Sequence, residues 1–128
     1  MLEIGIKETM EYIVTEDKLA TAVGSGSVAV LATPMMIAGM EGTAASSVQP
    51  HLDEDQTTVG IKLDVTHDAA TPCGMKVRFE SELIAVEGKI LTFAVQAFDE
   101  KDRIGGGTHK RAIVKKARFE ERAQTKLG

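Results

Sequence analysis

The chain has 128 residues, of which 43% are hydrophobic and 27% are charged. This composition predicts a single packed domain over residues 1–128 rather than a disordered chain. The net charge of −4 disfavours a nucleic-acid partner, because domains that bind nucleic acid normally carry a basic surface. One cysteine allows no internal disulfide and no cysteine-based metal site.

The N-terminal sequence "MLEIGIKETMEY" carries early charges and lacks the long apolar core of a signal peptide. The longest stretch of low charge, 19–40, is interrupted by Gly24, Gly26 and Pro34, so it is a poor candidate for a membrane span. We therefore expect a cytoplasmic protein without a membrane partner.

In chain order, the first predicted element is a strand, indicated by alternation over residues 10–14. Thr15, followed by two acidic residues, could cap a short helix that continues to about Val23. The sequence "GSGS" at 24–27 ends that helix.

The clearest helix is predicted from Thr33 to Gln49. Thr33 can serve as its N-cap, Pro34 suits its first turn, and Pro50 stops it. The segment is almost uncharged, which is typical of a helix buried on most sides. Glu41 is the one charge that interrupts it.

Four strands are predicted after this helix. The first places Val59, Ile61, Leu63, Val65 and His67 on one face, toward the helix. The second begins at residue 75 with Val77, Phe79, Ser81 and Leu83 facing inward, and a Glu87-Gly88 turn leads to a third strand over 91–97. A loop over 99–103 precedes a fourth strand over 108–117, and the polar tail is expected to fray.

One buried helix with consecutive antiparallel strands predicts an α+β fold in which a curved sheet wraps around the helix. An open sheet edge often pairs with a second copy, so we expect a homodimer.

His67 ends an apolar strand face with an imidazole. It is either a buried histidine that bonds a backbone group or a proton-transfer group at the mouth of a cleft. Glu41 either marks the wet side of its helix or meets a polar partner from the sheet, because an unpaired carboxylate is rarely buried.

Thr33 has a structural explanation as a helix cap and a functional one as a hydroxyl that faces a ligand at the positive end of the helix. His109 and Arg111 share a strand face within "GGGTHKR" and could be a solvent-facing pair at a strand start. Cys73 lies between a proline and a glycine, and nothing nearby would lower its thiol pKa. The three histidines are too scattered for a metal site.

The segments "ATPMMIAGMEGTA", "TTVGIKLDVTHDAATPCGMKV" and "VEGKILTFAVQAFDEKDRIGGGTHKRAIV" together resemble the hotdog-fold thioesterases of the fluoroacetyl-CoA thioesterase type. The resemblance covers roughly residues 8–120, and its most specific parts are V-T-H-x-A-A-T-P-x-G-M and G-T-H-x-R. It implies a curved antiparallel sheet around one long central helix, and a dimer with sites at the interface. Whether such dimers pair into a tetramer is left open by the sequence.

By the same resemblance, Thr33, Glu41 and His67 form the catalytic constellation. Gly60 matches a glycine whose backbone lies by the thioester carbonyl, and His109 and Arg111 are expected to bind substrate. No cofactor and no metal is implied.

The sequence departs from the family in one stretch. The fluoroacetyl-specific enzyme has a Phe-rich lid before its catalytic threonine, whereas "LATAVGSGSVAVLATP" has no aromatic residue here. We therefore expect an acyl-CoA thioesterase of more general preference. The alternatives are a non-catalytic acyl-CoA binding or sensing domain and a hotdog hydratase or dehydratase, although no Asp-x-x-x-x-His pair supports the last.

Overall fold

The computed structural model describes residues 2–128. Its strands and longer helices are β1 (Lys7–Ile13), α1 (Ala20–Val23), α2 (Thr33–Val48), β2 (Gln56–His67), β3 (Lys76–Glu87), β4 (Ile90–Phe98), β5 (Arg103–Lys115) and α3 (Lys116–Gln124). Short 3₁₀ turns lie at η1 (Glu16–Lys18), η2 (Gln49–His51) and η3 (Thr125–Leu127).

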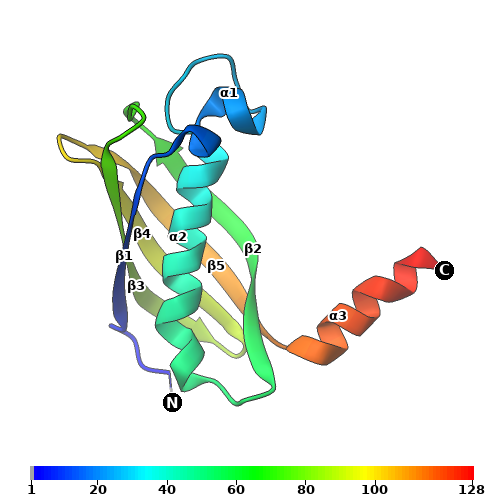
Figure 1. The fold of residues 1–128 in the computed structure, drawn as a ribbon. Coiled ribbons are helices and arrows are strands. Elements are labelled where there is room, and N and C mark those ends of the chain that lie inside the picture. Colours follow the sequence, from blue (N-terminus) through cyan, green and yellow to red (C-terminus); the bar gives the residue numbers. More distant parts are fainter. Residues whose placement is uncertain (1) are drawn as a thin grey trace.

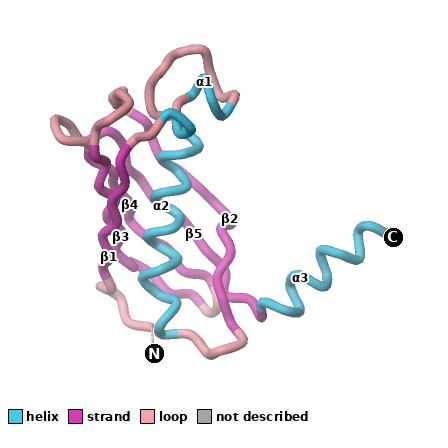
Figure 2. The backbone as a smooth tube through the Cα atoms, viewed as in Figure 1, coloured by secondary structure: helices cyan, strands magenta, loops and turns pink. Residues whose placement is uncertain are grey.

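The strands form one antiparallel sheet in the order β1-β3-β4-β5-β2. Helix α2 lies across one face of this sheet, and the sheet curves around it (Figure 1, Figure 2). The predicted α+β architecture is confirmed. Strands β1 and β2 are the two edges, so one long edge of β2 has no strand beside it.

The core lies between α2 and the sheet. Met36, Met40, Ala44 and Val48 recur every fourth residue of α2, so they form one buried stripe. They pack against inward side chains of the sheet, which include Val77, Phe79, Leu83, Leu91, Phe93 and Val95. The alternation predicted for β3 and β4 is thus confirmed. Gly39 allows close contact, because the Phe79 ring occupies the space that a Cβ at this position would need.

The predicted capping role of Thr33 is wrong. Ala32 is the N-cap of α2, and Thr33 is the first helical residue, followed by Pro34. The Thr33 hydroxyl makes no capping bond and is exposed at the surface of the helix start. It is therefore free for another partner.

The predicted first helix is also different in detail. The 3₁₀ turn η1 and the four-residue α1 replace one continuous helix, and Thr15 makes no side-chain bond to the helix backbone. Its hydroxyl bonds the Asp17 carboxylate instead. This region and the loop after it form the end of the molecule above the start of α2 (Figure 1).

Strand β2 contains a bulge that the alternation did not predict. Gly60 pairs with Arg111 and Lys62 with Lys110, so Ile61 is an extra residue between two ladder positions. Ile61 is consequently 51% exposed. The predicted inward face for Val59 and Ile61 is wrong, whereas Leu63, Val65 and His67 follow the bulge and are partly buried.

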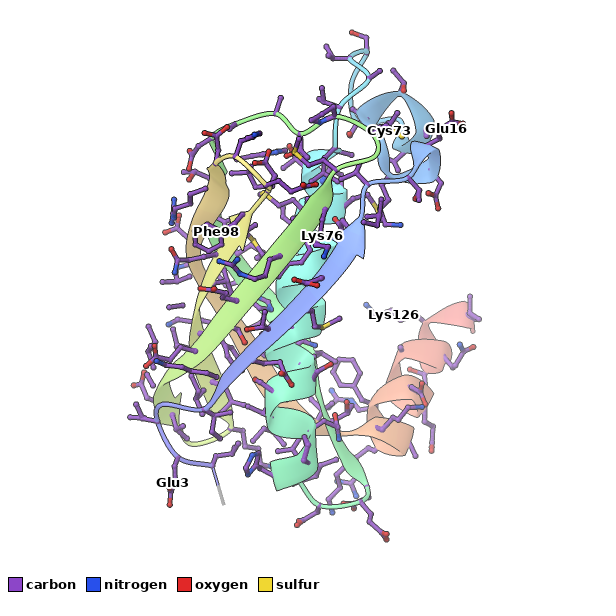
Figure 3. The ribbon with its side chains drawn as sticks, turned by 60° about the vertical axis from the view of Figure 1, so that its left-hand side comes forward. Glu3, Glu16, Cys73, Lys76, Phe98 and Lys126 are labelled. Atoms are coloured by element: carbon purple, nitrogen blue, oxygen red, sulfur yellow. The ribbon has the colours of Figure 1, made fainter. Side chains whose placement is uncertain are left out.

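The C-terminal tail was expected to fray, but residues 116–124 form helix α3, which stands clear of the sheet (Figure 1, Figure 3). Lys116 and Glu120 are four residues apart on it, and their side chains are 3.1 Å apart. Within residues 2–128, no helix combines the length and the apolar character that crossing a bilayer requires.

Candidate active site

The N-terminus of α2 and the C-terminal end of β2 bring a hydroxyl and an imidazole together. Thr33 Oγ1 lies 2.7 Å from His67 Nδ1, a hydrogen-bond distance. The two residues are 34 positions apart, and the curvature of β2 around α2 joins them. A hydroxyl that contacts an imidazole nitrogen at this distance is the arrangement that activates an oxygen nucleophile.

Both residues line a pocket of about 330 Å³. The remaining lining comes from the start of α1, the loop after it and the segment after β2, namely Ala20, Ser25, Gly26, Ser27, Val28, Val30, Leu31, Asp68, Ala69 and Ala70. These side chains are small or aliphatic apart from Asp68. The pocket is thus suited to a short apolar group held beside the Thr33 hydroxyl.

His67 presents only one of its ring nitrogens to this pocket. Its Nε2 atom is buried and has no hydrogen-bond partner within residues 2–128. Burial lowers the pKa of His67 from its ordinary value of 6.5, and the Asp68 carboxylate opposes part of this effect. The imidazole is therefore neutral at pH 7 and can accept a proton at Nδ1.

A second polar cluster surrounds Glu41 in the middle of α2. The Glu41 carboxylate lies 3.5 Å from Arg111 Nη1, and its side chain is 37% exposed. Arg111 is buried and donates further bonds to Thr58, from Nε to the hydroxyl at 2.8 Å and from Nη2 to the backbone carbonyl at 2.9 Å. Of the two alternatives for Glu41, the structure has the polar partner from the sheet. A solvent-facing His109–Arg111 pair is wrong, because both side chains are buried.

His109 completes this cluster in its neutral form. Its Nδ1 lies 2.8 Å from the Lys62 carbonyl, which can only accept, so the ring proton is on Nδ1. Its Nε2 then accepts from Arg111 Nη1 at 3.1 Å. Burial lowers the pKa of His109, in agreement with a neutral ring. Arg111 thus bridges His109 and Glu41, and the 3.9 Å approach of His109 to Glu41 is no ion pair.

Gly60 leaves the space that the Glu41 carboxylate uses. A Cβ at this position would collide with Glu41 Oε2 and come within 3.2 Å of His109 Cε1. Gly60 therefore faces α2 directly, and its backbone lies beside the carboxylate. Thr58 points to the same side of β2 as Gly60 and belongs to this cluster. The sequence did not indicate it, because the alternation without the bulge places Val59 and Ile61, and not Thr58, on the side of α2.

The two clusters do not meet within one chain. Thr33 and Glu41 are eight residues apart on α2, which corresponds to about 12 Å along the helix axis. Among residues 2–128, Glu41 makes no hydrogen bond or ion pair with Thr33 or His67. The first cluster thus consists of Thr33 and His67, at the start of α2. The second lies about two turns further along α2 and consists of Glu41, Gly60, His109 and Arg111.

Residues 14–117 match the protein family described as fluoroacetyl-CoA-specific thioesterase. The chain belongs to this family. A curated relative, the fluoroacetyl-CoA thioesterase of Streptantibioticus cattleyicolor, is 38% identical over 97 residues, which cover 76% of this chain and 70% of the relative. The protein is accordingly a thioester hydrolase.

Solved structures give the same family and fold. The fluoroacetyl-CoA thioesterase FlK matches with a TM-score of 0.94 and 31% identity over 98% of both chains. A thioesterase superfamily member from Thermus thermophilus matches with a TM-score of 0.89 and 28% identity, covering 98% of this chain and 93% of that one. A hot-dog-like protein from Thermanaerovibrio acidaminovorans is 21% identical with a TM-score of 0.88 over 99% of this chain and 94% of that one, which supports the hotdog fold alone.

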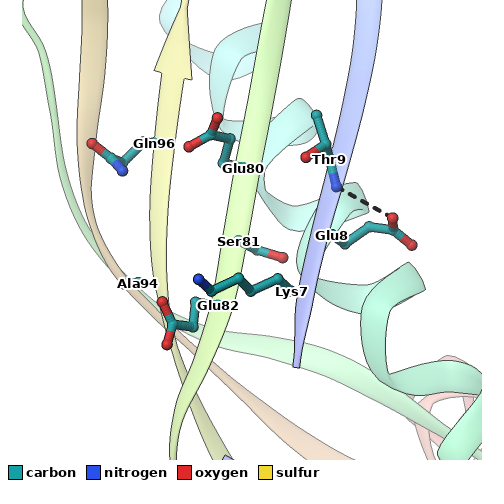
Figure 4. Close-up of a pocket in the computed structure, with 8 residues that line it drawn as sticks. All are labelled: Lys7, Glu8, Thr9, Glu80, Ser81, Glu82, Ala94 and Gln96. Atoms are coloured by element: carbon teal, nitrogen blue, oxygen red, sulfur yellow. Dashed lines mark hydrogen bonds between the residues drawn. The ribbon is translucent and has the colours of Figure 1, made fainter. Parts of the chain in front are cut away.

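Other features of this thioesterase lie away from the two clusters. A hollow of about 400 Å³ lies on the sheet face turned away from α2, where Figure 4 shows Lys7, Glu80, Glu82 and Gln96 around it. It has no histidine or cysteine in its lining. Cys73 is exposed in a loop at the end of the molecule that holds η1 (Figure 3). Residues 2–128 contain no cluster of metal-ligating side chains.

Replacing the buried Arg111 should destabilise this thioesterase. Arg111→Met keeps the volume of the side chain but leaves the Thr58 carbonyl and Glu41 without their cation. We expect a loss of about 2–3 kcal/mol in the free energy of unfolding, measured by urea denaturation, because hydrogen bonds to charged groups are strong when buried. Arg78→Met is the matched control, since Arg78 pairs with Glu80 at the surface and should cost less than about 1 kcal/mol. Equal losses in both variants would contradict this role of Arg111.

Proposed function

We propose that the protein hydrolyses acyl-CoA thioesters to a carboxylic acid and free CoA, with Thr33, Glu41 and His67 as its catalytic residues. The contact of 2.7 Å between the Thr33 hydroxyl and His67 Nδ1, at a pocket lined by small side chains, carries this proposal. The relative from Streptantibioticus cattleyicolor is named a fluoroacetyl-CoA thioesterase, and a variant of FlK was solved in complex with acetyl-CoA. Both names support a CoA thioester as the substrate class.

The site is completed by a second copy of the chain. Strand β2 is a free sheet edge, and the side of α2 next to it presents Pro34 and Ala38 to solvent. An antiparallel β2–β2 pair with its twofold axis midway between Gly60 and His67 sets each His67 opposite the partner's Gly60. The same axis passes α2 near Ile37, midway between Thr33 and Glu41.

Each of the two sites in this homodimer therefore combines Thr33 and His67 of one subunit with Glu41 and Gly60 of the partner subunit. The free edge of β2 and the separation of the two clusters within one chain both support this arrangement. Pairing of such dimers into tetramers is compatible with it.

In this mechanism, the attacking oxygen belongs to Thr33 or to a water held beside it, and His67 Nδ1 accepts its proton. Because Nε2 is enclosed by the chain itself, Glu41 acts on the attacking oxygen and does not orient the imidazole. The N-terminus of α2 and the backbone beside the partner's Gly60 stabilise the negative charge on the thioester oxygen. His67 then returns the proton to the sulfur of CoA, which leaves as a thiol. Attack by water gives the carboxylic acid directly, whereas attack by Thr33 leaves an acyl ester on its oxygen, which a water deprotonated by His67 then hydrolyses to the acid and the free hydroxyl.

His109 and Arg111 were expected to bind substrate. Both are buried and contact the Glu41 cluster, so we assign them the positioning of the Glu41 carboxylate. Arg111 also lowers the cost of desolvating this carboxylate when the dimer closes over it.

The acyl group that suits the pocket is short and not specifically fluorinated. The loop that covers Thr33 and His67 contributes Ser25, Ser27, Val28 and Val30 and no aromatic side chain. We also propose a cytoplasmic location, where acyl-CoA thioesters and reduced thiols such as Cys73 occur together.

Release of free thiol tests the proposed hydrolysis. The wild-type protein should release free thiol from at least one member of a panel of short, branched, aromatic and long acyl-CoAs, and His67→Ala should lower kcat by about 10²–10⁴-fold. Thr33→Ala identifies the nucleophile. An acyl-enzyme that forms in the wild type but not in Thr33→Ala assigns attack to the Thr33 hydroxyl. If no acyl-enzyme forms in either the wild type or the variant, attack is assigned to water. Binding of acyl-CoA without any thiol release would instead support the acyl-CoA sensing domain.

The pH profile of the reaction tests His67 as the general base. A general base must be deprotonated, so kcat/KM should fall only as the pH drops through the His67 pKa, which burial sets below 6.5. The acid limb should move lower still in Asp68→Asn, because the carboxylate of Asp68 raises the pKa of His67. Glu100→Gln, which removes a carboxylate outside the pocket, is the control. An acid limb that stays unchanged in Asp68→Asn would contradict His67 as the base.

Subunit mixing tests the shared site. His67→Ala and Glu41→Gln should each be inactive alone, but a mixed dimer holds one site with both defects and one with neither. Random exchange at equal amounts should therefore restore about a quarter of wild-type activity. Two different affinity tags verify that mixed dimers have formed. Mixed dimers without activity would show that each site takes Glu41 and His67 from the same chain.

A further inference from the structure

A third set of side chains, unused by the mechanism above, lines a hollow at the C-terminal end of β5. Its volume is about 320 Å³, and it lies between the β3–β4 turn, the end of β5 and the first turns of α3. Its lining consists of Lys89, Ile113, Val114, Lys115, Arg118, Phe119 and Arg122. We call it the cationic hollow.

The charge of this hollow is unusual for the chain. Four of its seven lining residues are lysine or arginine and none is acidic, although the whole protein has a net charge of −4. Within residues 2–128, none of the four forms an ion pair. The acidic Glu120 of α3 is paired with Lys116, and neither lines the hollow. The four cations are therefore available to an anion.

The hollow also contains an exposed aromatic ring. Phe119 is 46% exposed, and it is the only aromatic residue on α3. Arg118 and Arg122 are four residues apart, so their side chains lie one turn apart on the helix side that borders Phe119. A planar ring beside several cations is the combination that binds a nucleotide, whose base stacks while its phosphates pair with lysine and arginine.

The hollow lies on the same strand as Arg111 of the Glu41 cluster, further toward the C-terminal end of β5. Arg111, Ile113 and Lys115 alternate along β5, so they share the sheet face that α2 covers. Lys115 is four residues from Arg111, which corresponds to about 13 Å along the strand. The backbone N–H of Ile113 donates to the Lys89 carbonyl at 2.9 Å, so the β3–β4 turn is held beside this part of β5.

Helix α3 also lies on the relevant side of the molecule. It leaves the sheet beyond the start of β2, on the side of the free edge (Figure 1). In the proposed dimer, the start of β2 is near the end of the partner's β2, where the partner's Thr33–His67 pocket opens. In that dimer, the hollow of one subunit therefore lies at the same end of the paired sheet as the acyl pocket of the other subunit.

We propose that the cationic hollow binds the 3′-phosphoadenosine diphosphate end of the CoA thioester, with its phosphates on the lysine and arginine side chains and its adenine against Phe119. This inference rests on the proposed acyl-CoA substrate and adds its nucleotide subsite. The nucleotide takes no part in the chemical step, so the subsite contributes to substrate binding and leaves the reacting groups unchanged.

The experiment compares two thioesters with the same acyl group, an acyl-CoA and the corresponding acyl-pantetheine, which lacks the nucleotide. The wild-type protein should have a kcat/KM for acyl-CoA at least about tenfold higher, and this preference should shrink as salt is added. Arg118→Ala with Arg122→Ala should remove the preference by raising KM for acyl-CoA. Lys126→Ala changes the charge of the same C-terminal segment outside the hollow and should keep it.

A direct measurement makes the test independent of turnover. Titration calorimetry with adenosine 3′,5′-bisphosphate should show binding to the wild-type protein and to Lys126→Ala, and a loss of binding of about tenfold or more in the double variant and in Phe119→Ala. Size-exclusion chromatography of the double variant should show the wild-type oligomeric state. A change in that state would assign the hollow to a subunit contact and overturn the proposal.

Thioester hydrolysis and nucleotide binding at the hollow can be lost separately. Equal kcat/KM for the two thioesters, with no binding of the bisphosphate, would overturn the nucleotide subsite while thioester hydrolysis stands. Bisphosphate binding that depends on Arg118 and Arg122, without hydrolysis of any thioester, would overturn the proposed function and keep the subsite. Variants that bind the bisphosphate as tightly as the wild type would also overturn the assignment to this hollow.

Discussion

One extra residue in β2 sets the geometry of both polar clusters. Gly60 and His67 are seven residues apart, and in a regular strand this odd spacing would point them to opposite sides of the sheet. The bulge at Ile61 shifts the phase, so both face α2. The bulge also leaves the Ile61 side chain exposed on this edge strand. Without the bulge, either Gly60 would lose Glu41 or His67 would lose Thr33.

The second constraint is the cost of a carboxylate on an apolar helix. Glu41 lies among small and aliphatic neighbours on α2, and it is tolerated because Arg111 reaches it from β5 and because a third of its side chain is still hydrated. Arg111 is itself buried, and Thr58 and His109 take up its remaining donors. The cluster thus fixes the direction of one carboxylate at the surface. A side chain held in this way is pre-organised for chemistry with a group from outside the chain.

The sequence was informative where one periodicity extends over a whole element. The alternation of β3 and β4 and the uncharged α2 were predicted because their side chains face one uniform environment. The N-cap of α2 and the bulge were not, since each depends on a local choice. Ala32 takes the cap position that Thr33 could have occupied, and the bulge at Ile61 is defined only by pairing with β5. The roles of Gly60 and Glu41 came from the family resemblance, because residues 19 positions apart in different elements leave no local pattern.

The same reasoning explains why α3 escaped prediction and why its position matters. Six of its nine residues are polar, so no apolar stripe indicated a helix, and its local support is helix propensity with one Lys116–Glu120 pair. A polar helix that contacts little of its own domain gains nothing from core packing. Helix α3, which carries Arg118, Phe119 and Arg122, instead lies on the side of the free β2 edge, where the proposed second subunit would pair. In the proposed dimer, the reacting groups would come from α2 and β2, whereas the charge proposed to bind the nucleotide would come from α3. Catalysis and substrate capture are then physically separate, so α3 can change its charge without disturbing the Thr33–His67 contact.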